Sequence, residues 1–389
     1  MSTALLARSP QTTRPGIIPP PASRAIYFGA CTVLLLCILA ILLAHTSDYR
    51  LFGTYWESGH AAAHGLNPYA AYPHTFRFHP TPGDPRLFTD LNLSPPCVLP
   101  LLQILSHLSI DHFRVVASLA SWFLFALTAG LLLWHHPSMQ KRQILWLLLS
   151  VAVCDTLTLG QIYAIFFLLA ALAWISLSMH REWTAAIAIG LLLAMRPTLL
   201  FWPVFLYCAG QHRLARRAMA VACIASAYPV LLYGTGVYRE WVAALAHDAH
   251  GAIAANIAII PFFSRVGLSS LGVVLAVALA TALAWFCSKR KLDAESASAL
   301  ALGAWLLCSP LSWINYTLIA APWFIARRWT VLANIAAALL AIPMIIPARL
   351  SSGSTLHMVI GSGIYFIPVW LILWTFFNQS VCRNQSDSR

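Results

Sequence analysis

Long apolar runs recur along almost the whole chain, and they limit its fold more than any other feature. They extend from about residue 26 to residue 377, and many approach the roughly 20 residues that a helix needs to cross a bilayer. Lipid leaves helices and closed barrels as the only spanning structures, and the alternating ten-residue strands of a barrel are absent. Only 9% of the residues are charged, against about 25% in a soluble domain. The sequence therefore predicts an all-α polytopic membrane protein.

One short run decides the number of spans. Residues 97–109 would cover only about 20 Å as a helix, which is less than the hydrocarbon thickness, and they contain Pro100 and Gln103. If this run lies along the outer surface, about twelve membrane helices remain and both chain ends lie inside. The inner loops then hold most of the 24 lysines and arginines, as the positive-inside rule requires. Some spans, such as 183–195, are short and require tilt or a thin membrane.

The chain is expected to form a single membrane domain at residues 26–377, between cytoplasmic tails at residues 1–25 and 378–389. Its polar residues collect on the predicted outer side, in loops at about 45–114 and 234–267 that are expected to bear short interfacial helices. A charge at membrane depth costs about 2.5–3.5 kcal/mol. This one-sided clustering therefore favours a functional site at the outer face.

Charge and cysteine content argue against several other classes of protein. The cations behind the net charge of +12 cluster in short loops, so membrane topology explains them better than nucleic-acid binding. The nine cysteines lie mostly in apolar runs and form no CxxC pair, so no disulfide framework or zinc site is predicted. His60 and His64, with Glu57 nearby, have a spacing that suits zinc, but an interfacial helix is the simpler interpretation. We expect neither a metal nor a cofactor.

Six short motifs follow one another in a fixed order. They are Asp48 with Gly65-Leu66-Asn67-Pro68-Tyr69, Leu93-Ser94-Pro95-Pro96, Leu159-Gly160-Gln161, Met195-Arg196-Pro197-Thr198, Asn256 through Arg265, and Ser309-Pro310-Leu311-Ser312-Trp313. The ordered set, over about residues 25–330, resembles glycosyltransferase family 87, the polyprenol-phosphate-mannose-dependent α-1,2-mannosyltransferases of the membrane-spanning C superfamily. The chain departs from the family pattern at Asn315 and Tyr316, where the family often has histidines, and at Arg196, where lysine is common.

The resemblance implies transfer of a hexose, most simply mannose, from a polyprenyl-phosphate donor to a hydroxyl of a lipid- or glycan-linked acceptor, with inversion. One carboxylate suffices for this reaction, because the leaving lipid phosphate is already stable as an anion. Asp48, directly after the first span, is the expected general base, a role that contributes about 10²–10⁴-fold. A plainer alternative is that Asp48 ends the first span or caps the next helix. The expected location is the plasma or inner membrane, with the active site at the outer face.

Two arginines are the candidates for binding the donor phosphate. The planar guanidinium groups of Arg196 and Arg265 match a phosphate bidentately. Alternatively, Arg196 with Pro197 breaks a helix and extends its charge to the interface, and Arg265 is an ordinary loop cation.

Five further residues are candidate substrate contacts: Gln161, Asn256, Trp313, Tyr316 and Tyr69. Four of them also have a plainer role. Gln161 could bond to a neighbouring helix, Trp313 and Tyr316 could anchor the chain at the membrane interface, and the Gly65–Tyr69 segment could simply end a helix. Asp155, near Gln161, fits a helix cap slightly better than a site residue.

Two non-enzymatic functions also fit a polytopic chain. A flippase or transporter of lipid-linked saccharides needs a water-lined path with polar groups near the middle of the membrane, and few are present here. A structural subunit would not bring the outer polar groups together. Convergence of Asp48, Arg196, Arg265 and Tyr316 on one cavity would favour the enzyme. The expected partners are the lipid donor, the acceptor and membrane lipid, without nucleic acid.

Overall fold

The structure is a computed structural model of the 389-residue chain. It describes residues 29, 32, 33, 50–78, 87–247, 255–350 and 354–387. Most of the first predicted span, residues 26–44, and the candidate base Asp48 lie outside the described residues.

The described chain is almost entirely helical. In order, its α-helices are α2 (Arg50–Ala63), α3 (Leu99–Leu105), α4 (Ile110–His135), α5 (Lys141–Leu149), α6 (Val151–Leu159), α7 (Tyr163–Ser178), α8 (Glu182–Met195), α9 (Phe201–Cys208), α10 (His212–Tyr233), α11 (Gly236–His247), α12 (Ile259–Ser264), α13 (Ser269–Arg290), α14 (Ala294–Cys308), α15 (Thr317–Ala326), α16 (Val331–Leu339), α17 (Ile345–Leu350) and α18 (Thr355–Asp387). Short 3₁₀ turns are η1 (Pro73–Thr75), η2 (Pro96–Val98), η3 (Pro197–Leu200) and η5 (Ile314–Tyr316). The antiparallel strands β1 (Phe76–Phe78) and β2 (Leu87–Thr89) form a small hairpin.

Four helices of the described chain are long and apolar enough to cross a bilayer: α4, α10, α13 and α18. At 1.5 Å per residue, the 22 residues of α10 reach about 33 Å. Six further apolar helices or turn-and-helix pairs of 10–17 residues accompany them. The helical, membrane-spanning fold class is thus confirmed, whereas the expected count of about twelve spans is not.

Several apolar runs fold differently from the uninterrupted spans that we expected. The run at 144–158 is divided at Ser150, whose extended backbone (ψ 140°) separates α5 from α6. The run at 330–347 becomes α16 and α17, with Pro343 between them, because proline cannot continue a helix hydrogen-bond ladder. The loop at 234–267 contains the short helices α11 and α12, as expected for a loop that bears short helices. A periodic apolar run therefore does not reveal where its helix is interrupted.

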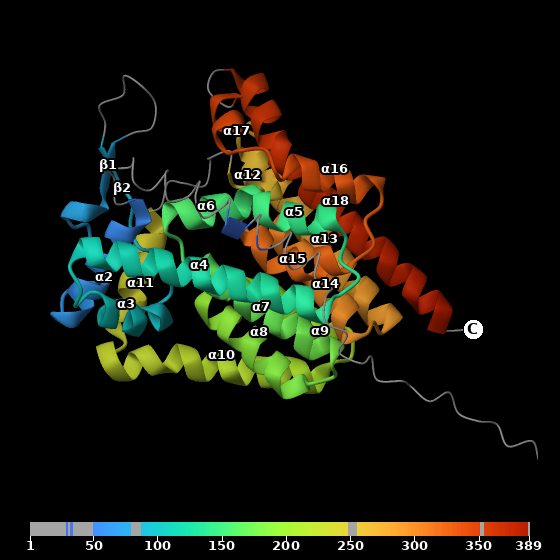
Figure 1. Cartoon of the computed structure of the whole chain (residues 1–389), viewed down its shortest axis with the longest axis horizontal. Helices are drawn as coiled ribbons and strands as arrows, with labels where there is room; N and C mark the ends of the chain where they lie inside the picture. The colour runs from blue at the N-terminus through green and yellow to red at the C-terminus, as the bar shows by residue number, and fades with distance from the viewer. Residues whose placement is uncertain are drawn as a thin grey trace, which may run out of the picture.

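The helices α4, α7, α8 and α10 run side by side along the long axis of the molecule (Figure 1). Small residues permit the closest contact in this layer. A Cβ atom on Gly190 of α8 would lie 2.6 Å from the carbonyl oxygen of Ala218 on α10, so only glycine allows these backbones to approach so closely.

The helix α14 is the centre of the bundle. Its residues from Ser296 to Cys308 are all buried, as expected for a helix that is apolar on every face. The buried Trp202 of α9 donates its indole N–H to the hydroxyl of Ser298 on α14 at 2.8 Å. The buried Trp305 of α14 donates its indole N–H to the hydroxyl of Thr198 at 3.0 Å. The core is therefore apolar without leaving these indoles unpaired.

Polar bonds between helices gather at the two ends of the bundle. At one end, Gln143 donates to the carbonyls of Ile325 (2.9 Å) and Arg327 (3.0 Å), and Arg327 pairs with Glu295 at 3.8 Å. The opposite end carries α2, α3, α11 and the hairpin (Figure 1). Arg196, which interacts electrostatically with Tyr55 of α2, lies at this end. We call this the Arg196 end.

The short run at 97–109 forms η2 and the seven-residue α3, which at about 10 Å is too short to cross the hydrocarbon core. It lies against α2 at the Arg196 end (Figure 1). The contact is tight, because a Cβ atom on Gly59 would come within 2.2 Å of the carbonyl oxygen of Leu102. The helices α2 and α3 therefore form one rigid unit beside the ends of the longer helices.

Candidate functional site

Arg196 lies where α8 stops. Pro197 follows it directly, and the residue before a proline avoids the helical region, so the Arg196 backbone is extended (φ −148°, ψ 84°). Its amide still closes the last turn of α8 by donating to the carbonyl of Leu192 at 2.8 Å. The expected helix break at Arg196 and Pro197 is thus present.

An aromatic cage surrounds the half-buried Arg196 guanidinium. Its Nη2 donates a hydrogen bond to the hydroxyl of Tyr163. Its central carbon lies 4.7 Å from the centre of the Tyr316 ring and 5.4 Å from that of Tyr163. Cation–π contacts of this kind are worth about 0.5–2 kcal/mol each. The cage rests on the core, because the Tyr316 ring is 1% exposed and stacks on Trp305 with centres 5.2 Å apart.

Several buried polar atoms of this cage and of the chain segments next to it have no hydrogen-bond partner within the described part of the chain. They are Arg196 Nε, Gln161 Oε1, Ser312 Oγ, Asn315 Oδ1 and the Tyr316 hydroxyl. Buried polar groups are nearly always paired in folded proteins, so a local cluster of unpaired ones marks a place where a ligand or water completes the bonding. Within the same described ranges, Arg196 forms no ion pair.

The start of α2 is held against the turn that contains Gln161. Gly160 adopts a left-handed conformation (φ 75°), and a Cβ atom there would lie 2.4 Å from the ring of Phe52. One turn further along α2, the buried Tyr55 interacts electrostatically with Tyr163 and Arg196, and burial raises the pKa of the Tyr55 phenol well above its ordinary value. The helix that directly follows Asp48 in the sequence therefore faces the Arg196 cage.

A second arginine, Arg265, is linked through Asn256 to the segment that carries Tyr316. Arg265 is 9% exposed, and its Nη2 donates to the carbonyl of Asn256 at 2.8 Å. Burial lowers the pKa of Arg265 to about 10, so it is charged at neutral pH. Asn256 forms a β-bridge with Trp313, three residues before Tyr316. The structure thus brings Arg196 and Arg265 to two ends of one short segment, residues 312–316.

The candidate contact Asn256 is fully buried, and its side-chain oxygen accepts backbone hydrogen bonds from Ser312 (3.0 Å) and Ala258 (3.4 Å). These bonds, with those between the Ile257 amide and the Ser312 carbonyl (2.8 Å), fasten the segment 255–258 to 312–314. The geometry gives Asn256 a positioning role. Trp313, half-buried beside it, packs against the main core.

Tyr69 belongs to a second core cluster, together with Phe52 and Leu99. Its hydroxyl donates to the Ser94 carbonyl at 3.0 Å, and the side chain is 3% exposed. Gly65 (φ 67°) ends α2, as expected for this turn. Tyr69 thus ties the turn after α2 to the segment before α3, and the structure does not bring it into the Arg196 cage.

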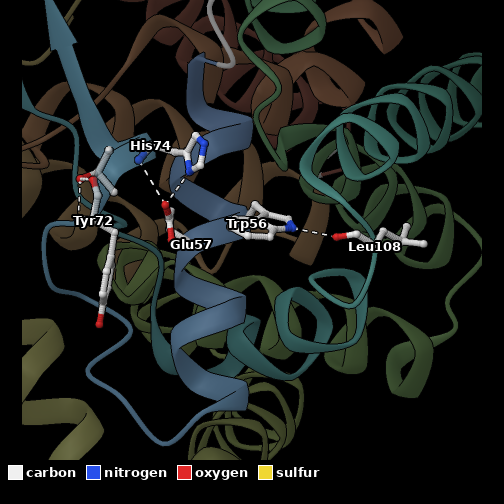
Figure 2. Close-up of polar contacts among 6 residues, drawn as sticks. Trp56, Glu57, Tyr72, His74 and Leu108 are labelled. Carbon is white, nitrogen blue, oxygen red and sulfur yellow. Dashed lines mark hydrogen bonds and ion pairs between the residues drawn. The ribbon is translucent and has the colours of Figure 1, made fainter.

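The histidines of α2 stack on one another and on Trp56. The rings of Trp56 and His60 stack at 4.9 Å, and His64 follows at 4.3 Å. Buried Glu57 accepts hydrogen bonds from the His74 ring (2.6 Å) and the His74 amide (3.2 Å), which attaches η1 to α2, as Figure 2 shows. In the described ranges, no three His, Cys, Asp or Glu side chains are grouped to hold a metal ion.

Two residues that sequence reasoning missed are central here, Tyr163 and Trp305. Tyr163 follows Gln161 by two residues at the start of α7, so its proximity to a motif was a usable signal. Trp305 lies in an apolar run with no such signal.

The prediction for Asp155 was wrong. We favoured this residue as a helix cap, but it lies inside α6.

Comparison with protein families identifies the chain. The sequence model of glycosyltransferase family 87 matches residues 92–310, more than half of the chain. The chain belongs to glycosyltransferase family 87. The match to family 87 contains Gln161, Arg196, Asn256 and Arg265. Comparison with curated proteins gives no match. Family membership and the apolar helices together make this protein a membrane glycosyltransferase.

Proposed function

We propose that this glycosyltransferase moves a hexose from a polyprenyl-phosphate donor to an acceptor hydroxyl, and that Arg196 binds the donor phosphate. The surroundings of Arg196 carry the proposal. The guanidinium is half-buried among aromatic rings, has no ion-pair partner within the described chain, and has an unpaired buried Nε. A charge in such a place is costly without a counter-ion. A phosphate supplies that counter-ion and matches the planar guanidinium bidentately.

The position of the cage favours a donor carried on a lipid. Arg196 lies at the end of α8, one of the apolar helices, beside the ends of α7 and η5. A polyprenyl chain can remain in the bilayer while its phosphate reaches a cation at this depth. The aromatic faces of Tyr316 and Trp313 are suited to contact the sugar or the first isoprene units.

Asp48 is proposed as the general base. In this reaction the bond from the anomeric carbon to the acceptor oxygen forms as the bond to the phosphate oxygen breaks. The acceptor proton goes to the carboxylate, and the bonding electrons leave with the polyprenyl phosphate, whose charge Arg196 balances. Attack opposite the phosphate inverts the anomeric configuration. The contact between Phe52 and Gly160 supports this role, since it holds the helix after Asp48 against the cage.

Some of the remaining candidates are proposed to line the site, and others to hold its segments in place. Gln161 is assigned to the donor site because its buried side-chain oxygen is unpaired and Tyr163 is two residues away. Arg265 is assigned as a second cation on the 312–316 segment, and Trp313 as a wall of the site. Asn256 and Tyr69 are proposed to position these segments. Mannose as the sugar, and the outer face of the cell membrane as the location, rest on the motif resemblance and on the distribution of charge along the chain.

The test is a transfer assay with purified full-length protein and radiolabelled polyprenyl-phosphate mannose or glucose, using membrane lipid extracts as acceptor. We expect Asp48→Asn and Arg196→Gln to lose at least 10²-fold in kcat/KM. The matched control is Arg217→Gln, because Arg217 stacks on Trp183 at 4.3 Å and pairs with exposed Glu182. Near-normal transfer by Asp48→Asn would defeat the base assignment, and wild-type protein inactive with every lipid donor would defeat the proposed function.

A further inference from the structure

A pocket of about 400 Å³ opens beside the Arg196 end, in a place that the proposed phosphate site does not use. Its lining residues come from the end of α2 and the turn after it, from α3, from the end of α10 and from the start of α11. Figure 1 shows that these elements lie together at the Arg196 end. Its volume is in the range of pockets that hold small molecules. The family motif at 65–68 lines one wall, although Tyr69, the next residue, points into the core.

The polar groups of this pocket come from three helices, α3, α10 and α11, and from the turn after α2. Tyr233, at the end of α10, donates its hydroxyl to Gln103 Oε1 at 2.6 Å. This bond occupies the amide oxygen of Gln103 and leaves its NH₂ group as a donor, while the Tyr233 oxygen can still accept. Asn67 uses its side-chain oxygen for the Tyr69 amide at 2.8 Å, so its NH₂ group is also available. The carboxylate of half-buried Glu240 adds an acceptor.

The walls are fixed before any ligand arrives. Trp241, next to Glu240, donates its indole N–H to the Leu93 carbonyl at 3.1 Å, and Tyr238 donates its hydroxyl to the Ser226 carbonyl at 2.6 Å. These bonds hold α11 against α10 and against the segment before α3. A pre-formed site loses less entropy when it binds a ligand.

We propose that this pocket binds a neutral saccharide, the part of the acceptor glycan that lies away from the reacting hydroxyl. Amide donors, a phenol and a carboxylate beside apolar Leu66 and Val237 match a pyranose, which presents alternating hydroxyls and C–H faces. Glu240 is the only ionisable acid or base among the lining residues other than the Tyr233 phenol. Its negative charge disfavours a phosphate, so this pocket is separate from the donor site. The acceptor assignment rests on the proposed transferase reaction, whereas saccharide binding does not.

Binding is measured on full-length protein in nanodiscs by saturation-transfer NMR, with methyl α-mannoside and maltose as probes and inorganic phosphate as the anionic comparison. We expect at least one saccharide to bind and phosphate not to compete with it. Gln103→Leu and the near-isosteric Glu240→Gln should weaken saccharide binding about tenfold or more. Arg239→Gln is the matched control, since exposed Arg239 adjoins Glu240 on α11 but does not line the pocket.

A second readout separates this inference from the proposed function. Pocket variants should lose transfer to the glycan acceptor while keeping slow hydrolysis of the lipid donor by water, whereas Arg196→Gln should lose both. The unfolding temperature of Glu240→Gln is measured first, to show that the variant is folded. Unchanged saccharide binding by this variant would overturn the pocket assignment. A wild-type protein that binds neither saccharide would also overturn it. Normal saccharide binding by the pocket variants would defeat the pocket assignment alone. Absence of sugar transfer by the wild-type protein would defeat the proposed function alone.

Discussion

The guanidinium carbon of Arg196 lies 4.7 Å from the centre of the Tyr316 ring, and the two residues are 120 positions apart in the sequence (316 − 196). Arg196 ends α8 and Tyr316 ends η5, so their contact joins two helix ends at the Arg196 end of the bundle. This contact places a cation against the segment to which Arg265 is also attached through Asn256.

The planar shape of the Arg196 guanidinium is expected to matter for transfer as well as its positive charge. In Arg196→Lys the cation remains, but the planar fork that binds a phosphate bidentately and stacks on Tyr316 is lost. We expect kcat/KM to fall about 10-fold to 100-fold, less than in Arg196→Gln, with the unfolding temperature nearly unchanged. Steady-state transfer kinetics measure this, alongside Arg217→Lys as control. Equal activity of Arg196→Lys and wild type would contradict a bidentate role.

The two phenols of the cage should behave differently. Tyr163→Phe removes the acceptor of the Arg196 hydrogen bond, so the guanidinium loses its orientation. Tyr316→Phe keeps the ring beneath the cation and removes a hydroxyl that has no partner within the described chain. We expect Tyr316→Phe to change the free energy of unfolding by less than about 0.5 kcal/mol while reducing transfer about tenfold.

A double-mutant cycle distinguishes the roles of these phenols. If Tyr163 acts through Arg196, then adding Tyr163→Phe to Arg196→Gln should cost little further activity. Additive losses would show that Tyr163 contacts the substrate independently. Full activity in Tyr316→Phe would exclude its hydroxyl from the site.

Asn256 is expected to support stability more than chemistry. Asn256→Ala leaves the buried Ser312 amide without its 3.0 Å acceptor, which costs about 1–3 kcal/mol. The unfolding temperature should fall clearly, and activity should fall with the folded fraction. The control is Asn334→Ala, because Asn334 makes only an exposed bond to its own helix at the Thr330 carbonyl. A stable but inactive Asn256→Ala protein would instead indicate direct substrate contact.

Gly160 should tolerate no side chain. Alanine there meets both a left-handed backbone and the Phe52 ring at 2.4 Å, so we expect a loss above the roughly 1–3 kcal/mol of backbone strain alone. Gly210→Ala is the matched control, since φ is 88° and nothing lies within 4 Å of its Cβ position. Thermal unfolding measures both. Because the clash is with the Phe52 ring, Phe52→Leu in the Gly160→Ala background should restore part of the stability, and no restoration would contradict the steric explanation.

The sequence by itself determined the class of fold and the family. Long apolar runs leave a bilayer-spanning chain no alternative to helices, because lipid cannot satisfy exposed backbone groups. The shortness of the 97–109 run, together with Pro100 and Gln103 in it, argued against a span there, and α3 has only seven residues. The ordered motifs indicated glycosyltransferase family 87, which the family match at 92–310 confirms. The helix end at Gly65 and the break at Arg196 with Pro197 were also readable, since glycine and proline restrict the backbone locally.

Only the tertiary structure decided which polar residues meet. Sequence order could not show that Tyr163, Trp305 and Tyr316 form a cage around Arg196, because these contacts join helix ends far apart in the chain. Nor could it assign Asn256 to the backbone of Ser312, or Tyr69 to the carbonyl of Ser94, since an amide or phenol looks the same in sequence whether it holds a loop or a ligand. The division of the 144–158 run at Ser150 was likewise not visible in the sequence. Apolar periodicity shows which residues avoid water, whereas the packing of neighbouring helices decides where each helix ends.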